Sequence, residues 1–333
     1  MATLDLGRAN GLIRTVFLPK IIDTITQSNP LFLMMRDKGE LFEGGETITT
    51  PIMYGEYAEG EGGSFGDTDD VLQSEAGEDA AGVAFDWASY SQPIRITIRD
   101  LAKFASSEAA AVRLLRIRAQ SAGMKMADRF GDHLYAPVGH DITDILSTVD
   151  IFDDTITYGG IDRAAAGNDF WKAKHVDAST DAVTATAITL RDVHDTIEEA
   201  TEGNIRPDIG LTDKAAYNRI WELQMANMRY GDTDVVEYGG FTGIKVDGVP
   251  IFPDSHADNG GTDAGSNIRH TVRFYNLDYL HWVGHDDFNF VTTDLDFMSK
   301  TSPVLLSQIF WFGQFYCDNP RYQSELLRVL STA

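Results

Sequence analysis

The segment between residues 39 and 94 constrains the fold most, because strand-like ends enclose a long glycine-rich middle. It holds 13 of the 51 acidic residues of the chain and none of the 27 Lys and Arg residues. Residues 46–54 and 83–99 each have the composition of a strand. The middle has no helical periodicity, and loops longer than about 12 to 15 residues in compact domains are usually functional or disordered. The pattern predicts a long excursion on a two-stranded base.

The second of these strands ends in strict alternation of apolar and polar residues. The two sets are Ile94, Ile96 and Ile98 on one side and Arg95, Thr97 and Arg99 on the other. Since successive side chains of a strand point to opposite faces, this pattern predicts that the isoleucine face is buried.

A long helix is predicted next, beginning after Ser106 or Ser107 as N-cap and ending before Pro137. It would be about 43 Å long at 1.5 Å per residue. Apolar residues recur every three or four positions and form one stripe: Val112, Leu115, Ala119, Ala122, Met126 and Phe130. Basic residues occupy other positions: Arg113, Arg116, Arg118, Lys125 and Arg129. The pattern predicts an amphipathic, basic helix.

The remaining segments alternate in an α+β manner. Two short helices are expected over residues 18–36, separated where Asn29 precedes Pro30. Thr189 is expected to cap a helix that ends before Gly203, and Thr212 or Asp213 to begin another that runs toward Arg229. Strands are expected at residues 209–211, 244–246, 249–252, 271–275, 288–292 and 304–317. A hairpin turn is expected at residues 247–248. An exposed connection is expected at residues 254–267, and a short tail from residue 319.

The net charge of −24 argues against a general nucleic-acid-binding surface, which needs clustered Lys and Arg. Two interpretations of the acidity remain open: a well-solvated surface, or adaptation to a salty environment. Cys317 is the single cysteine, so no internal disulfide is expected. No export signal is expected at residues 1–10, and the most apolar stretch, residues 304–317, is shorter than the roughly 18 residues of a membrane span.

The sequence predicts no catalytic, cofactor-binding or metal site, and therefore no enzyme. Ser64 lies in a Gly-x-Ser-x-Gly match, but both flanks are acidic loop instead of strand and helix. His281 and His285 could ligate a metal on a helix, yet Trp282, Val283 and Gly284 between them favour strand and turn. A structural histidine pair is the expectation.

Several segments in this order resemble the major capsid proteins of tailed phages with the Hong Kong 97-like fold. The residues that carry the resemblance are 29–33, Gly44-Gly45, 51–55, Phe85, Trp87, Tyr90, Pro93-Ile94, 159–163, Phe170-Trp171, the helix from Leu190, 240–250 and 317–321. No single motif is diagnostic, but their shared order covers nearly the whole chain. The resemblance implies a coat protein that forms pentamers and hexamers of an icosahedral shell around packaged double-stranded DNA.

The resemblance also implies a division of the chain, a location and partners. The expected parts are an N-terminal arm (1–40), an extended hairpin arm (41–98), a spine helix with part of a peripheral domain (99–140), most of an axial domain (141–270), and return strands with a C-terminal tail (271–333). The expected location is the virion capsid, assembled in the host cytoplasm. The expected partners are copies of the chain itself, a portal and a decoration protein, with DNA enclosed but not specifically bound, and no membrane.

Two departures from the family pattern matter. The chain opens almost directly at the N-terminal arm, without the scaffolding segment of some relatives, which implies a separate scaffold protein or prior cleavage. The hairpin arm contains no lysine, whereas the founding type joins a lysine there to an asparagine of a neighbour. A covalent cross-link between subunits is therefore not expected.

We hypothesise that the acidic arm of one subunit lies across the basic helix of another. The candidate contact residues are Glu59, Glu61, Phe65, Asp67, Asp69, Asp70, Arg113, Arg116, Arg118 and Arg129. Val83 and Phe85 are further apolar candidates. The alternatives are a disordered arm without a partner, an encapsulin-like nanocompartment that encloses an enzyme, and a soluble hydrolase acting through Ser64 or His281.

Overall fold

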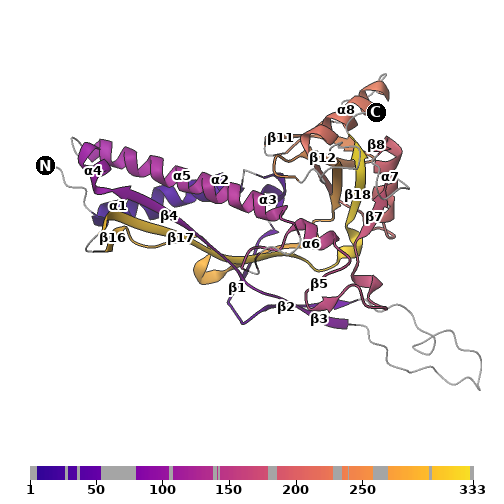
Figure 1. The fold of residues 1–333 in the computed structure, drawn as a ribbon, viewed down its shortest axis with the longest axis horizontal. Coiled ribbons are helices and arrows are strands. Elements are labelled where there is room, and N and C mark those ends of the chain that lie inside the picture. The colour runs from indigo at the N-terminus through magenta and orange to yellow at the C-terminus, as the bar shows by residue number, and fades with distance from the viewer. Residues whose placement is uncertain are drawn as a thin grey trace, which may run out of the picture.

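The computed structural model describes residues 6–26, 29–35, 38–53, 80–104, 108–137, 141, 143–178, 186–227, 235–238, 240–257, 269–299 and 302–330. It is an elongated molecule with two main sheets (Figure 1). A six-stranded sheet lies under a long helix, and an eight-stranded sheet with two helices forms the other end. The mixture of helices and sheets confirms the α+β prediction.

The six-stranded sheet is built around β17 (Ser302–Cys317). Its other strands are β1 (Glu40–Phe42), β4 (Ala88–Thr97), β14 (Leu280–His285), β15 (Val291–Thr292) and β16 (Asp296–Ser299). β4 pairs antiparallel with β17 along its whole length, and β14, β15 and β16 also pair with β17. β1 extends the sheet by pairing in parallel with β14.

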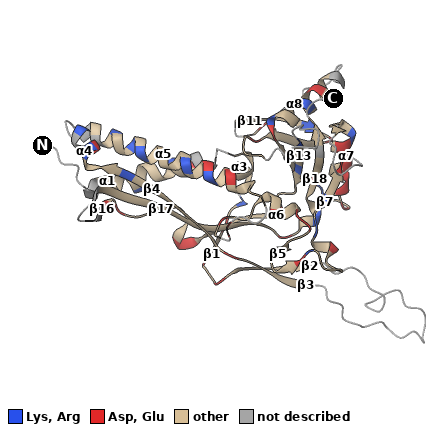
Figure 2. Ribbon diagram, viewed as in Figure 1, with Lys and Arg blue, Asp and Glu red and all other residues tan. Residues whose placement is uncertain are grey.

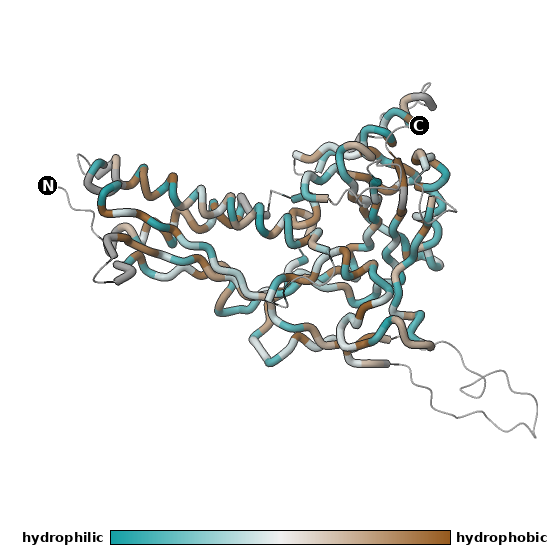
Figure 3. The backbone as a smooth tube through the Cα atoms, in the orientation of Figure 1, coloured by the Kyte–Doolittle hydropathy of each residue, from teal (hydrophilic) through white to brown (hydrophobic). Residues whose placement is uncertain are grey.

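The helix α5 (Glu108–Leu134) lies along β4, as Figure 1 shows. The predicted apolar stripe is confirmed, since Leu115, Ala119 and Phe130 are completely buried. Figure 3 shows hydrophobic and hydrophilic residues alternating along α5, as expected for an amphipathic helix. The predicted N-cap at Ser106 or Ser107 lies outside the described residues.

The N-terminal segment packs along α5. α1 (Leu6–Leu12), the π-helical turn η1 (Ile13–Phe17) and α2 (Leu18–Thr26) follow one another directly, and α3 (Pro30–Met35) begins at the predicted Asn29-Pro30 break. Gly123 of α5 permits close packing, because a Cβ there would lie 3.0 Å from Cγ2 of Ile21. The N-terminal segment therefore contributes to the core of the first sheet.

Aromatic rings fill the space between α5 and the sheet. Phe130 makes edge-to-face contacts with Phe32, Trp282 and Trp311, at centroid distances of 6.0, 5.7 and 5.0 Å. Trp282 and Trp311 stack on each other at 4.7 Å. Such pairs add about 0.5 to 1.5 kcal/mol beyond the burial of their area.

The eight-stranded sheet has a mixed order, β10-β11-β12-β9-β13-β18-β7, with β8 also paired to β18. The strands are β7 (Lys174–Asp177), β8 (Thr186–Ala187), β9 (Ile209–Thr212), β10 (Val235–Tyr238), β11 (Phe241–Val246), β12 (Val249–Pro253), β13 (His270–Tyr275) and β18 (Ser324–Leu330). α7 (Leu190–Glu199) packs on β7 and β18, and α8 (Lys214–Asn227) packs on β12 and β13. A second hydrophobic core lies between these helices and the sheet.

Local predictions in this part are confirmed. Thr189 caps α7 in a capping box, in which Asp192 N donates to the Thr189 side chain and Thr189 N donates to the Asp192 carboxylate. The hairpin β11–β12 turns at Asp247 and Gly248, whose φ angles of 51° and 89° suit the tight turn that joins such strands.

The base of the predicted arm is a two-stranded hairpin of β2 (Ile48–Met53) and β3 (Ala80–Phe85). The strands pair antiparallel from Ile48 opposite Phe85 to Met53 opposite Ala80. The long excursion predicted between them, residues 54–79, lies outside the described residues. The remaining elements are α4 (Ile98–Phe104), α6 (Thr148–Phe152), β5 (Thr157–Tyr158), β6 (Ile161–Asp162), η3 (Asp169–Trp171), η4 (Asp286–Phe288) and η5 (Pro320–Tyr322).

The prediction of one strand over residues 83–99 is wrong at two places. The strand is interrupted at residues 86 and 87, between β3 and β4. Ile98 does not continue the buried face; it begins α4 and is 40% exposed. The cause is local, because the hydroxyl of Thr97 accepts a hydrogen bond from Asp100 N and caps the helix.

Two further predictions are wrong, and a third is wrong at its first residue. The expected tail after residue 319 contains β18, which pairs with β13, β7 and β8. The expected strand at residues 288–292 is only β15, since Phe288 ends the turn η4. The expected exposed connection at residues 254–267 begins at a buried residue, Asp254, while residues 258–267 lie outside the described part of the chain.

Candidate assembly site

The solvent-exposed surface of α5 carries several basic side chains. Figure 2 shows Lys and Arg residues along this helix. The four candidate residues, Arg113, Arg116, Arg118 and Arg129, are all exposed. Arg118 has a partner within the chain, because its Nη2 lies 3.2 Å from Oδ2 of Asp100 on α4. The structure therefore presents the helical half of the predicted contact on an accessible surface.

Two apolar side chains on α5 were missed by the sequence reasoning. Ile117 and Met124 are 55% and 63% exposed, two helical turns apart among the arginines. The signal was present in the sequence, since both residues fall outside the apolar stripe that packs on the sheet. Exposed apolar groups next to charged ones suit a contact that excludes water.

The acidic half of the predicted contact is the set of arm candidates between residues 59 and 70. The arm candidates Glu59, Glu61, Phe65, Asp67, Asp69 and Asp70 all lie outside the described residues. Val83 and Phe85 are described, and they are buried within their own subunit. These two residues are therefore part of the anchor of the arm and are not available to a neighbouring subunit.

The anchor of the arm is built from β17 and from the turn between β5 and β6. Ala84 N of β3 donates a hydrogen bond of 3.1 Å to the carbonyl oxygen of Gly159. The ring of Phe85 stacks on Tyr316 at 4.6 Å and contacts Tyr158 edge-to-face at 5.2 Å. The base of the arm thus has a fixed position on the body of the molecule.

The two histidines singled out by the sequence lie in a strand, as expected. His281 is in β14 and forms an ion pair with Asp318, with Nε2 3.0 Å from Oδ2. His285 ends β14, and its Nδ1 accepts a hydrogen bond from Asp287 N. Both side chains have structural partners. Ser64 lies outside the described residues.

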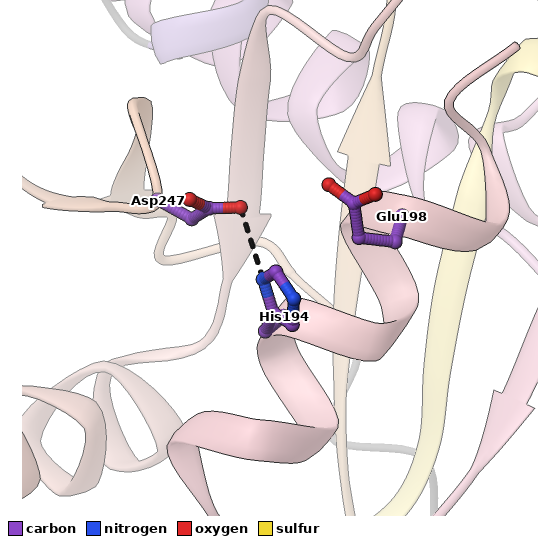
Figure 4. Close-up of side chains that lie close together, drawn as sticks. All are labelled: His194, Glu198 and Asp247. Carbon is purple, nitrogen blue, oxygen red and sulfur yellow. Dashed lines mark hydrogen bonds and ion pairs between the residues drawn. The ribbon is translucent and has the colours of Figure 1, made fainter.

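Within the described part of the chain, one group of side chains has the composition of a metal site: His194, Glu198 and Asp247 (Figure 4). His194 Nδ1 lies 3.0 Å from Oδ2 of Asp247. The same oxygen is 2.6 Å from Nη2 of Arg206. Because a guanidinium already neutralises Asp247, we interpret the group as a polar link between α7 and the β11–β12 turn.

None of the helices in the described part of the chain combines the length and apolar character needed to cross a bilayer.

Comparison with known proteins identifies the fold. No protein-family model matches the sequence, and no curated protein is similar to it in sequence. Solved structures are similar over most of the chain. The capsid asymmetric unit of cyanophage A-1(L) matches with a TM-score of 0.62 and 13% identity, over 90% of this chain and 92% of that one. The capsid of a native GTA particle matches with a TM-score of 0.54 and 11% identity, over 91% and 90%.

A third similar structure comes from a different kind of particle. The SrpI encapsulin of Synechococcus elongatus matches with a TM-score of 0.51 and 11% identity, over 77% of this chain and 79% of that one. The similarity covers more than three quarters of this chain in each of the three comparisons. The molecule therefore has the Hong Kong 97-like fold of tailed-phage capsids and encapsulins.

Proposed function

We propose that this chain is the major capsid protein of a tailed phage. The observation that supports it most is the coverage of the fold: about nine tenths of this chain and of the cyanophage capsid subunit superpose. The described chain therefore has the elements of a subunit of the kind that builds such shells. The proposed product is an icosahedral shell of pentamers and hexamers around double-stranded DNA.

Assembly would follow from contacts between unlike surfaces of identical subunits. Such contacts close into rings when the rotation between subunits closes. In this proposal the arm of one subunit lies across α5 of another, with Arg113, Arg116 and Arg129 facing its carboxylates. Arg118 contributes less, because Asp100 of its own subunit already pairs with it.

The strength of the proposed contact is collective. An exposed ion pair contributes only about 0 to 1 kcal/mol and is screened over about 10 Å at 0.1 M salt. Ile117 and Met124 add apolar surface that salt does not weaken, and we propose that Phe65 of the arm covers them. The proposed contact is therefore partly, but not wholly, sensitive to salt.

Deleting residues 59–82 tests the role of the arm. The deletion leaves β2 and the buried Val83 and Phe85 in place, but it also removes the first half of β3, residues 80–82, which the Gly/Ser control retains. We expect folded subunits or capsomers that do not form stable shells. A matched control is the replacement of residues 59–79 by a neutral Gly/Ser segment of equal length, which retains the length but not the charge. Normal shells from the deletion variant would contradict this role.

An encapsulin-like nanocompartment is the second candidate function, and the similarity to the SrpI encapsulin supports considering it. Nuclease-protected DNA inside particles from the native source distinguishes the two. We expect protected double-stranded DNA of a phage genome. Particles that enclose a folded protein instead of DNA would favour the nanocompartment.

The further partners follow from the proposed capsid role. We infer a separate scaffold protein, a portal and a decoration protein, with assembly in the host cytoplasm. The division into N-terminal arm, hairpin arm, spine helix, peripheral domain and axial domain is part of the same proposal. We also propose that the chain is not an enzyme.

A further inference from the structure

A stack of three rings holds the base of the arm. Tyr316 of β17 is buried, and its ring lies 4.6 Å from Phe85 and 5.1 Å from His281, with interplanar angles of 21° and 25°. The Tyr316 hydroxyl is 3.1 Å from Oγ1 of Thr50. Thr50 belongs to β2 and Phe85 to β3, so one tyrosine contacts both strands of the arm.

Two carboxylates face the histidine of this stack. Nε2 of His281 lies 3.0 Å from Oδ2 of Asp318, and Nδ1 lies 3.8 Å from Oε1 of Glu40. Glu40 belongs to β1, the strand that leads into the arm. The nearby cation, Lys38, forms its own ion pair with Asp278 at 2.6 Å. His281 is therefore the group placed to neutralise both Asp318 and Glu40.

The charge state of His281 follows from these neighbours. Burial lowers the pKa of His281, but the close carboxylate of Asp318 and the charge of Glu40 together outweigh it, and the pKa rises above its ordinary value of 6.5. A histidine whose pKa is higher in the folded state stabilises that state at low pH. This stabilisation is lost as the pH rises above 6.5 through the raised pKa. Burial also raises the pKa of Tyr316, so the tyrosine stays neutral over this range.

We propose that His281 is a protonation-dependent anchor for the assembly arm. In its charged form the imidazole joins β14 to Asp318 and β1 and keeps Tyr316 packed against Thr50 and Phe85. In its neutral form the two carboxylates lose their counter-charge, and β1 and the arm base loosen. If the arm base loosens, the direction of the arm would depend on pH, and this regulatory consequence rests on the proposed capsid function. The loosening of β1 and the arm base does not depend on that function.

Hydrogen exchange of the full-length subunit tests the local step without any shell. We would compare protection of peptides from β1, β2 and β3 at about pH 6 and about pH 8.5, corrected for intrinsic exchange rates. We expect protection to fall by about threefold or more at the higher pH, while β18 stays unchanged. Equal protection of the arm base at both values would overturn the proposal, whatever the chain assembles into.

Variants separate the histidine from other titrating groups. His281→Phe retains a ring on Tyr316 without the charge, so the arm base should be weakly protected at both pH values. Asp318→Asn keeps the stack intact and should move the loss of protection to lower pH. The control is His175→Phe, because His175 also pairs with a carboxylate, Asp154 at 3.3 Å, but lies in β7 of the other sheet. An unchanged pH dependence in both His281→Phe and Asp318→Asn would contradict the assignment to His281.

Discussion

The side-chain amide of Asn29 donates a hydrogen bond of 2.6 Å to Oδ2 of Asp254, 225 residues later in the chain. Tyr135, just after α5, donates a second hydrogen bond to the same oxygen at 2.9 Å, and His256 N donates to Oδ1 at 3.0 Å. One buried carboxylate thus joins the N-terminal segment, the end of α5 and the end of β12. This contact links the N-terminal segment and α5 to the eight-stranded sheet, beside the hydrophobic core that the two sheets share.

Asn29→Ala should destabilise the subunit by roughly 1 to 3 kcal/mol, because it removes a donor from a buried carboxylate. Burial already raises the pKa of Asp254 above 3.8, and the bond from Asn29 opposes that rise. The penalty should therefore be full at neutral pH and shrink as the pH falls toward 3.8. Urea unfolding of wild type and variant, at neutral pH and at a pH nearer 3.8, measures this loss of unfolding free energy.

The control for that measurement is Asn168→Ala. Asn168 Nδ2 also makes a short hydrogen bond, 2.7 Å to the carbonyl oxygen of Asp162, but in an exposed turn. Its loss should cost less than about 1 kcal/mol at either pH. Equal costs for the two substitutions would show that the buried junction has no special role.

Gly159→Ala should disturb the base of the arm. Gly159 has a φ of 59°, and a Cβ there would lie 3.0 Å from Cζ of Phe85 and 3.1 Å from Cβ of Val83. Gly160→Ala is a matched control, since its φ is 88° but a Cβ would meet nothing within 4 Å. We expect about 1 kcal/mol of backbone strain in both variants and roughly 1 to 3 kcal/mol more in Gly159→Ala. Thermal unfolding measures the stability of both variants, and equal stability would contradict the prediction.

Reversing two charges on α5 should weaken shells without unfolding the subunit. The double variant Arg113→Glu, Arg116→Glu changes exposed residues, so subunit stability should stay within about 0.5 kcal/mol of wild type. Shells should form only at reduced yield and dissociate at lower salt concentration. Arg191→Glu on α7 is the control, because Arg191 is exposed but lies outside the proposed contact. Light scattering over a salt series reports the result, and equal dissociation of both variants would count against the contact.

Cys317 should be unreactive in the folded subunit. The thiol is completely buried, and burial raises its pKa, so little thiolate forms. Labelling with a thiol reagent at about pH 8 should be about a thousandfold slower than in denaturant. Rapid labelling under native conditions would mean that β17 opens locally at its C-terminal end.

Local signals in the sequence were sufficient for much of the fold. The stripe of α5, the break at Asn29-Pro30 and the cap at Thr189 each depend on residues within a few positions of one another. The start of α4 was also readable, since Thr97 with Asp100 three residues later forms a capping pattern. It was missed because the alternation of isoleucines continues to Ile98.

Non-local pairing explains the larger errors. β18 was predicted as a tail because its strand character depends on parallel partners, β7 and β8, that are more than a hundred residues away in sequence. The polar Asp254 suggested an exposed loop, yet it is buried and accepts hydrogen bonds from Asn29 and Tyr135 of two distant segments, as well as from the neighbouring His256 N. For the assembly site, the exposure of the arginines was predictable, but the contact of Tyr316 with both arm strands was not, because it joins three separate strands.

Electron microscopy of the purified, recombinant chain across a salt series from about 50 mM to about 1 M tests the central claim most directly. The account predicts closed icosahedral shells with pentameric and hexameric capsomers, in which density from one subunit crosses α5 of its neighbour. Monomers at every salt concentration, in the presence as well as the absence of a scaffold protein from the same source, would contradict it.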